Sequence, residues 1–278
     1  MIVTLLVEKR KNRNIAEFLS SLFVPFKISS RVIKQYHVSV LQIRYQLMRG
    51  KINFGWLYPC LSGKDLMVLC DKNTDLSSTK LTRFESSDFN RAMMLSFIRN
   101  MNENGKLELS GVRAAYFDPM GEHPDEAEQL AEILPGLMVI TDMPKYYEIF
   151  ADNLMDEKGL MLTVSNDYGQ FTDKQLVVTS GAIDRNLPLS SQSIVFSPER
   201  PLVSTKCSVL WKFAVETPQK YSRLKPDWID DEYFLSALYS LEGIKKLESL
   251  IPDSAGSGNE SFTDESLIRR LCAIKKSA

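Results

Sequence analysis

The stretch VRAAYFDPMGEHPDEAEQL at residues 112–130 decides the fold, because it places a strand, a turn and a helix in immediate succession. Residues 113–117 form a short, mostly apolar run that is typical of a buried strand and that ends at Asp118. The spacing of apolar residues after the turn predicts a helix over 124–134. A strand followed closely by a helix is the repeating unit of α/β proteins.

The same pattern continues downstream and sets the fold class. A second apolar run at 137–141 ends at Asp142, a helical pattern covers 145–158, and further strands are predicted at 160–164 and 175–179. Strands that alternate with helices of this length predict a parallel sheet covered by helices. We therefore expect an α/β fold with a Rossmann-like three-layer parallel-sheet core in the C-terminal part, preceded by a smaller α+β module.

Three segments are expected along the chain. They are an α+β N-terminal module at residues 1–105, a Rossmann-like α/β domain at 106–252, and a flexible linker plus a short amphipathic C-terminal helix at 253–278. Residues 253–261 contain one apolar residue, Ala255, which predicts a flexible linker. The helix places Leu267, Leu271 and Ile274 on one face, so it would fold back on its own domain or dock on a partner.

Local patterns in the N-terminal module predict helices as well as strands. Apolar residues within 31–48 recur at spacings of three and four, which predicts a long amphipathic helix that would carry His37. The other elements expected there are strands at 1–7, 52–57, 66–70 and 81–84 and helices at 15–23 and 88–101. Beyond the central unit we expect a strand at 193–196, a strand or a helix start at 208–215, and a helix at 230–250.

The composition is that of an ordinary folded protein, with 278 residues of which 44% are hydrophobic and 25% charged. The formal net charge of −1 gives no overall attraction to nucleic acid or to an anionic membrane, so neither is expected as a partner. Residues 1–50 carry nine Lys or Arg against two acidic residues, whereas 101–160 carry thirteen acidic residues against four basic ones. These are solvated or mutually complementary faces, or a basic surface for an anionic partner.

The cysteines and the two histidines form no metal-binding pattern. Cys60, Cys70, Cys207 and Cys272 include no C-x-x-C pair, which favours buried or incidental thiols in a reducing compartment. The apolar N-terminal run is too short for a signal peptide, and its charges follow it instead of preceding it. No run approaches the roughly 18 apolar residues of a membrane span, so we expect a cytoplasmic protein.

A binding site is expected at the carboxyl ends of the strands, where parallel sheets take ligands beside a switch in strand order. The turn after the first strand has one glycine, and it lacks the glycine-rich pattern that lets a pyrophosphate approach a helix N-terminus. Its acidic residues would also repel a pyrophosphate. The candidate ligand- or cofactor-binding residues at the strand ends are Asp118, Gly121, His123, Asp142, Ser165, Thr179, Ser180 and Gly181.

One spacing favours a cofactor nevertheless. Asp142 follows Asp118 at nearly the distance at which a nucleotide-binding fold places the acid for the ribose hydroxyls. Residues 137–183 resemble, in the spacing of their elements, the later strands of a Rossmann-type dehydrogenase domain. The resemblance implies NAD(P), with Asp142 at the ribose and residues 179–181 near the nicotinamide. Asp142 would equally serve as a helix N-cap, since Pro144 follows two residues later.

No catalytic motif fixes a reaction. The chain contains neither the G-x-x-x-x-G-K-[ST] pattern of a phosphate loop nor the G-x-S-x-G pattern of a serine nucleophile. His123, at the mouth of the expected cleft, is the titratable residue that stands out. No metal is assigned, although Asp118, Glu122 and Asp125 are the oxygen ligands that a divalent metal uses.

Three functions remain open. The leading one is a cytoplasmic protein whose Rossmann-like domain lacks the cofactor loop and binds a small ligand or a protein partner at the carboxyl edge of the sheet. The second is an NAD(P)-dependent oxidoreductase with an atypical cofactor loop. The third is an interaction or regulatory protein that acts through the basic N-terminal module and the C-terminal helix.

Overall fold

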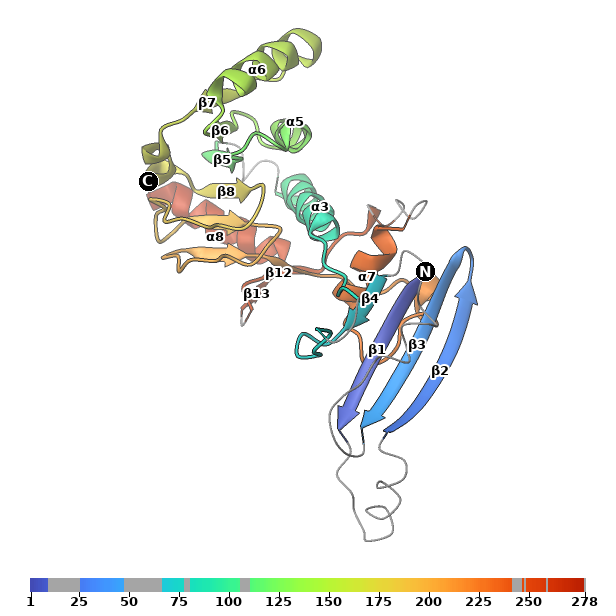
Figure 1. Cartoon of the computed structure of the whole chain (residues 1–278). Coiled ribbons are helices and arrows are strands. Elements are labelled where there is room, and N and C mark those ends of the chain that lie inside the picture. Colours follow the sequence, from blue (N-terminus) through green and yellow to red (C-terminus); the bar gives the residue numbers. More distant parts are fainter. Residues whose placement is uncertain are drawn as a thin grey trace. The chain divides into compact units, whose positions relative to one another are not determined.

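The computed structural model describes residues 1–9, 26–47, 67–77, 81–105, 111–241, 247, 249–258 and 260–277. The helix expected at 15–23, the strand expected at 52–57 and Cys60 lie outside these residues. The chain divides into two compact units (Figure 1). Unit 1 comprises residues 1–86 and 216–245, and unit 2 comprises residues 87–215 and 246–278.

Unit 2 is built on a six-stranded sheet in which all neighbouring strands are parallel. The strands are β5 (Ala114–Phe117), β6 (Met138–Ile140), β7 (Thr163–Ser165), β8 (Leu176–Thr179), β9 (Ile194–Phe196) and β10 (Ser208–Leu210). Their order across the sheet is β10-β9-β8-β5-β6-β7. Counted from β5 as the first strand, this is the 3-2-1-4-5-6 order of the Rossmann fold. The expected α/β class with a Rossmann-like core is therefore confirmed.

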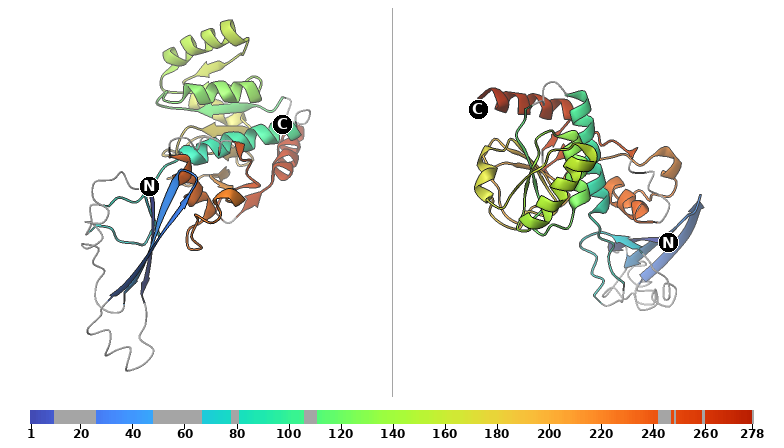
Figure 2. Two further views of the ribbon diagram at one scale, coloured as in Figure 1. Left: turned by 90° about the vertical axis from the view of Figure 1, so that its right-hand side faces the viewer. Right: turned by 90° about the horizontal axis from the view of Figure 1, so that it is seen from above.

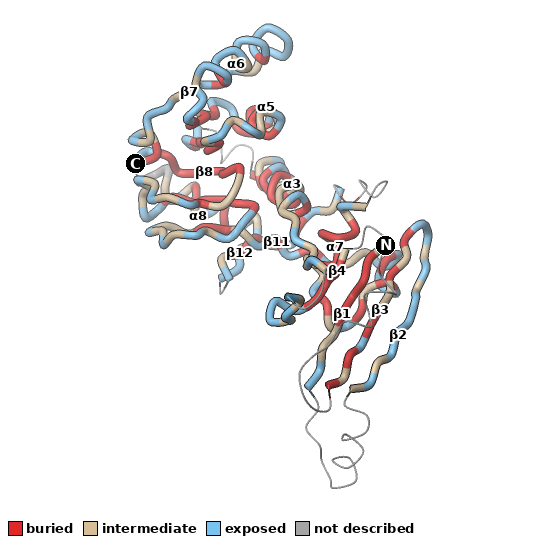
Figure 3. The backbone as a smooth tube through the Cα atoms, in the orientation of Figure 1, coloured by how far each residue is buried: buried red, intermediate tan, exposed pale blue. Residues whose placement is uncertain are grey.

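The two faces of this sheet are covered differently. Helices α3 (Asp88–Asn104) and α5 (Pro124–Ile133) lie along one side of it, and α6 (Pro144–Lys158) follows β6 (Figures 1 and 2). On the other face, the 3-10 helix η1 (Tyr168–Asp173) packs with the loops after β8 around a core of buried strand residues. The central strands β5 and β8 are buried on both faces (Figure 3), which is why they appear in the sequence as continuous apolar runs.

Helix α3 belongs to unit 2, although the expected N-terminal module ended at residue 105. The ring of Phe97 in α3 packs against two other rings. Its centroid lies 5.9 Å from that of Phe196 in β9 and 6.3 Å from that of Phe213 in β11 (Lys212–Ala214). Helix α8 (Asp264–Ser277) also contacts α3, and both Leu267 and Leu271 are fully buried. The apolar face of the C-terminal helix is therefore occupied by its own unit.

The prediction of a flexible linker from residue 253 onward is wrong for the linker residues that the structure describes. Strand β12 (Ser254–Gly256) pairs antiparallel with β11 and with β13 (Ser261–Phe262). Ala255, the one apolar residue of 253–261, is fully buried. A Cβ on Gly256 would lie 2.7 Å from the carbonyl oxygen of Glu260, so the turn requires glycine for steric reasons. The composition predicted flexibility because the small residues that permit this close pairing are also those of flexible linkers.

Unit 1 contains a four-stranded sheet in the order β2-β3-β1-β4. Its strands are β1 (Ile2–Lys9), β2 (Phe26–Gln35), β3 (Val38–Leu47) and β4 (Met67–Cys70), and helix α7 (Asp231–Tyr239) contacts β4. Strand β1 is parallel to β3 and β4, whereas β2 and β3 form an antiparallel hairpin. The strands expected at 1–7 and 66–70 are thus confirmed, while residues 81–84 contribute a single bridge at Arg83.

The helix predicted at 31–48 is wrong, because these residues form most of the β2–β3 hairpin. Tyr36 and His37 make its turn, and Tyr36 has a positive φ of 54° that a helix cannot contain. The buried positions of β3 change face midway: Val38 and Val40 are buried on one face, and Ile43, Tyr45 and Leu47 on the other. Because of this change of face, apolar residues of the strand recur at spacings of three and four, which is the pattern of an amphipathic helix.

Within the parts of the chain that the structure describes, no helix is long and apolar enough to cross a membrane.

Candidate functional site

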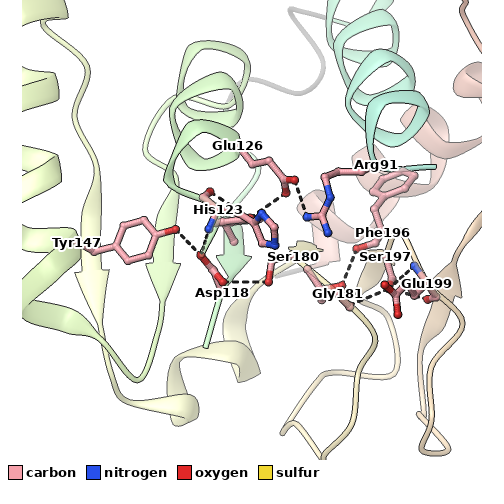
Figure 4. Close-up of polar contacts among 12 residues, drawn as sticks. Arg91, Asp118, His123, Glu126, Tyr147, Ser180, Gly181, Phe196, Ser197 and Glu199 are labelled. Atoms are coloured by element: carbon pink, nitrogen blue, oxygen red, sulfur yellow. Dashed lines mark hydrogen bonds and ion pairs between the residues drawn. The ribbon is translucent and has the colours of Figure 1, made fainter. Parts of the chain in front are cut away.

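The carboxyl ends of β5 and β8 meet at the point where the strand order of the six-stranded sheet reverses. Asp118 follows β5 and Ser180 follows β8, so the fold brings these two predicted residues together. The Ser180 hydroxyl donates a hydrogen bond of 3.1 Å to Asp118 Oδ1 (Figure 4). In open α/β sheets this switch point is the usual place for a ligand.

Asp118 is buried at this point, with 1% of its surface exposed. Its Oδ2 accepts a hydrogen bond of 2.8 Å from the Tyr147 hydroxyl of α6 and one of 2.9 Å from the backbone amide of His123. Together with Ser180 these groups give the carboxylate three donors, which compensates for its removal from water. We call Asp118, His123, Tyr147 and Ser180 the Asp118 cluster.

A partly buried ion pair continues the network into the first turn of α5. Glu126 accepts hydrogen bonds from Arg91 of α3, at 2.6 Å, and from the Tyr116 hydroxyl of β5, at 2.9 Å. Burial, reinforced by the neighbouring carboxylates, raises the pKa values of Tyr116 and Tyr147 far above the ordinary value for tyrosine. Both hydroxyls therefore remain protonated donors and hold the carboxylates in place.

The turn between β5 and α5 closes over this network without a phosphate-binding loop. Gly121 has a φ of +69°, a conformation that a glycine adopts without steric cost. A Cβ at Gly121 would lie 3.3 Å from Cβ of Met143 and 3.5 Å from the ring of Tyr146, so the turn packs against the start of α6. Gly121 thus has a packing role at the start of α6.

A second, exposed group of side chains lies after β6. Asp142 accepts a hydrogen bond of 2.6 Å from the Tyr168 hydroxyl and forms an ion pair of 3.4 Å with Arg185, and its side chain is 48% exposed. Arg185 also pairs with Asp184, whose carboxylate raises the pKa of the guanidinium. We call Asp142, Tyr168 and Arg185 the Asp142 cluster. Asp142 does not serve as the side-chain cap of α6, because the N-cap position is Met143 and Thr141 Oγ1 accepts its amide.

The remaining predicted residues support the backbone. The Thr179 hydroxyl donates to the carbonyl of Gly181, at 2.7 Å, and the Ser197 hydroxyl donates to the same carbonyl, at 3.1 Å. Ser165 lies at the end of β7, separated from β8 by β5 and β6, and its hydroxyl accepts the amide of Asp167. Thr179, Gly181 and Ser165 thus make their own local turns and belong to neither cluster.

The structure brings together three of the predicted residues, Asp118, His123 and Ser180, and holds Asp142 in a different group. His123 contributes its backbone amide to the cluster. Among the described residues, no group of three His, Cys, Asp or Glu side chains is arranged to hold a metal. The acidic trio considered in the sequence is divided, since Asp118 is buried whereas Glu122 and Asp125 are exposed.

Sequence reasoning missed the partners of the two aspartates. Tyr147 lies on a helix whose apolar spacing accounts for an aromatic residue, and nothing local signals that its hydroxyl reaches Asp118. Tyr168 and Arg185 lie in a 3-10 helix and a loop, where no periodic pattern applies. A signal for Tyr147 existed in principle, because a buried tyrosine hydroxyl requires an acceptor.

Comparisons with known proteins found similarity to solved structures alone. No protein-family model and no curated protein sequence matches the chain. Similar solved structures include quinate dehydrogenase from Corynebacterium glutamicum in complex with NAD, at 10% identity over 71% of this chain and 79% of that one, with a TM-score of 0.31. L-tryptophan dehydrogenase from Nostoc punctiforme is 11% identical over 99% and 88%, with a TM-score of 0.30. A shikimate dehydrogenase in complex with NADP+ is 8% identical over 100% and 96%, with a TM-score of 0.29.

At such identities and TM-scores the likeness says nothing about the activity of this chain. The assignment of a Rossmann-like fold rests on the order and direction of its own six strands.

Proposed function

We propose that this chain is a Rossmann-like binding protein that takes a small ligand or a protein partner at the carboxyl edge of its six-stranded sheet and does not bind a dinucleotide at the switch point. One observation carries the proposal: the Asp118 carboxylate is buried at the switch point and already accepts three hydrogen bonds. A buried carboxylate with this many internal partners stabilises the fold.

The residues of the first turn do not fit a dinucleotide bound in the usual way. A pyrophosphate at the start of α5 would lie beside Asp118, and two unit negative charges about 4 Å apart repel by roughly 4 kcal/mol near a protein surface. The exposed carboxylates of Glu122 and Asp125 add to this repulsion. Gly121, the one glycine of the turn, is packed against α6. A neutral or cationic ligand, or a protein surface, meets no such obstacle.

A thermal-shift screen of the full chain against nucleotides, nicotinamide and adenosyl cofactors and divalent metals tests the proposal. A ligand present at 100 times its Kd stabilises the folded state by about 2.7 kcal/mol, which is readily measured. We expect no shift with NAD+ or NADP+ at millimolar concentration. A shift with either one that is lost in Asp142→Ala would contradict the proposal.

An NAD(P)-dependent oxidoreductase is the second candidate, and one specific observation favours it. Asp142 follows the second strand of a sheet with Rossmann order, where such folds place the acid for the ribose hydroxyls, and it remains half exposed. A ribose would have to compete with Tyr168 and Arg185 for this carboxylate. The same screen decides between the candidates, because this one requires that a nicotinamide cofactor protect the fold.

A further inference from the structure

The first half of α6 exposes apolar side chains at the same edge of the sheet. Ile149 and Met120 are both 65% exposed, and Met143 and Tyr146 are about half exposed. The helix buries only Tyr147 and Leu154, so most of its surface faces away from its own sheet (Figure 3). A surface helix normally turns polar residues outward, and an apolar group in that position therefore calls for an explanation.

These four residues lie on α6 and in the turns next to its N-terminus. Met143, the N-cap of α6, is followed at intervals of three by Tyr146 and Ile149, which places the three residues on neighbouring parts of one flank. The turn that carries Met120 packs on the same helix, because a Cβ at Gly121 would touch both Met143 and Tyr146. We call Met120, Met143, Tyr146 and Ile149 the α6 patch. Two of its members are methionines, whose flexible side chains adapt to the shape of a partner.

The charges next to the α6 patch are almost all negative. Exposed carboxylates lie next to its members along the chain, and they belong to Glu122, Glu148, Asp152 and Asp156. Asp142 is exposed as well, but it forms an ion pair with Arg185. Lys145 is the exposed base within the same stretch of α6. An apolar surface bordered by carboxylates is complementary to a helix with one apolar face and flanking Lys or Arg side chains. It repels nucleic acid and anionic membranes, and it also repels the same patch on a second copy of the chain.

We propose that the α6 patch is the docking surface for a basic amphipathic helix of a protein partner. The inference deepens the proposed function, because it names the class of partner at the carboxyl edge of the sheet. The apolar side chains of the partner would cover Met143, Tyr146 and Ile149, and its basic side chains would pair with Asp152 and Asp156.

The test uses the full chain and a synthetic peptide whose leucines and lysines would lie on opposite faces of a helix. Binding is followed by fluorescence anisotropy. Two control peptides accompany it. One has the same composition in an order that does not segregate leucine from lysine on a helix, and the other carries glutamate in place of lysine. We expect the first peptide to bind at least about tenfold more tightly than either control.

Variants of the chain locate the binding surface. Ile149→Ser combined with Met143→Ser removes mainly exposed apolar groups, so the unfolding midpoint should change little while the affinity for the peptide falls about tenfold or more. Leu202→Ser is the matched control, because Leu202 is 75% exposed elsewhere on the same unit, and its affinity should stay within about twofold of the unaltered chain. Asp152→Lys combined with Asp156→Lys should weaken binding most at low ionic strength.

Three outcomes would overturn the proposal. The first is equal binding of the helical and the reordered peptide, which would mean unspecific charge attraction. The second is binding that survives the Met143 and Ile149 changes. The third is a dimer in light scattering that these changes convert to a monomer, since a second copy would then cover the patch. A failure here is distinguishable from a failure of the proposed function, which depends on cofactor binding alone.

Discussion

Two aspartates end neighbouring strands of the same sheet and have opposite surroundings. Asp118, after β5, is 1% exposed and accepts three hydrogen bonds, whereas the side chain of Asp142, after β6, is 48% exposed and belongs to a surface ion pair. The sheet supplies equivalent positions, and the neighbouring elements decide what each carboxylate does. Burial turns Asp118 into part of the fold, and exposure leaves Asp142 accessible to a ligand.

The largest difference is expected when each carboxylate is removed. Asp118→Ala leaves two hydroxyls and one backbone amide without their acceptor, and each such buried donor costs about 1–3 kcal/mol. We therefore expect a loss of about 3–5 kcal/mol in the free energy of unfolding, measured by urea denaturation. Asp142→Ala removes an exposed pair and should cost less than about 1 kcal/mol. Similar losses in both variants would refute the distinction between a buried and an exposed aspartate.

The tyrosine partners of the two aspartates sharpen the comparison. Tyr147→Phe keeps the ring but removes the donor to Asp118, so about 1.5 kcal/mol of stability should be lost. Tyr168→Phe is the matched change at Asp142, and because that carboxylate faces water the loss should stay below about 0.5 kcal/mol. Denaturation of the two variants under one set of conditions measures both values. A larger loss for Tyr168→Phe would contradict the account.

Alkaline pH probes the same buried hydroxyls. Burial raises the pKa values of Tyr116 and Tyr147 in the folded chain, while the unfolded chain titrates near pH 10. Stability should therefore be unaffected by these groups below about pH 10. Above it, stability should fall by about 1.4 kcal/mol per pH unit for each tyrosine, because the unfolded chain then binds fewer protons.

The matched experiment compares Tyr147→Phe with the unaltered chain between about pH 10 and pH 11. The variant lacks one of the two buried hydroxyls, so its free energy of unfolding should decline less steeply. Identical pH profiles would mean that Tyr147 ionises as easily in the folded chain as in the unfolded one.

The central α/β unit was predictable because burial on both faces converts parallel strands into short apolar runs. Residues 114–117 and 176–179 are buried throughout, and helices α5 and α6 follow β5 and β6. The β2–β3 hairpin was not predictable in the same way. Strand β3 changes its buried face midway, near Gln42, which donates a hydrogen bond to the carbonyl of Leu224. Leu224 is distant from Gln42 in the sequence, so the spacing of apolar residues within the strand does not reveal this contact.

The site was predictable in its position and not in its partners. Asp118 and Ser180 were expected at strand ends, and the strand order then placed them side by side. Tyr147 reaches Asp118 from α6, and Arg91 reaches Glu126 from α3, through contacts that only the folded chain creates. The position of Asp142 suggested a ribose contact or a helix cap; the structure pairs it with Arg185 and does not use its side chain as the cap of α6.

The most direct test of the central claim is calorimetric titration of the full chain with NAD+ and with NADP+. If the Asp118 cluster excludes a dinucleotide from the switch point, neither cofactor should give a saturable heat at millimolar concentration. Saturable binding of either cofactor that disappears in Asp142→Ala would contradict the claim and would support the oxidoreductase candidate.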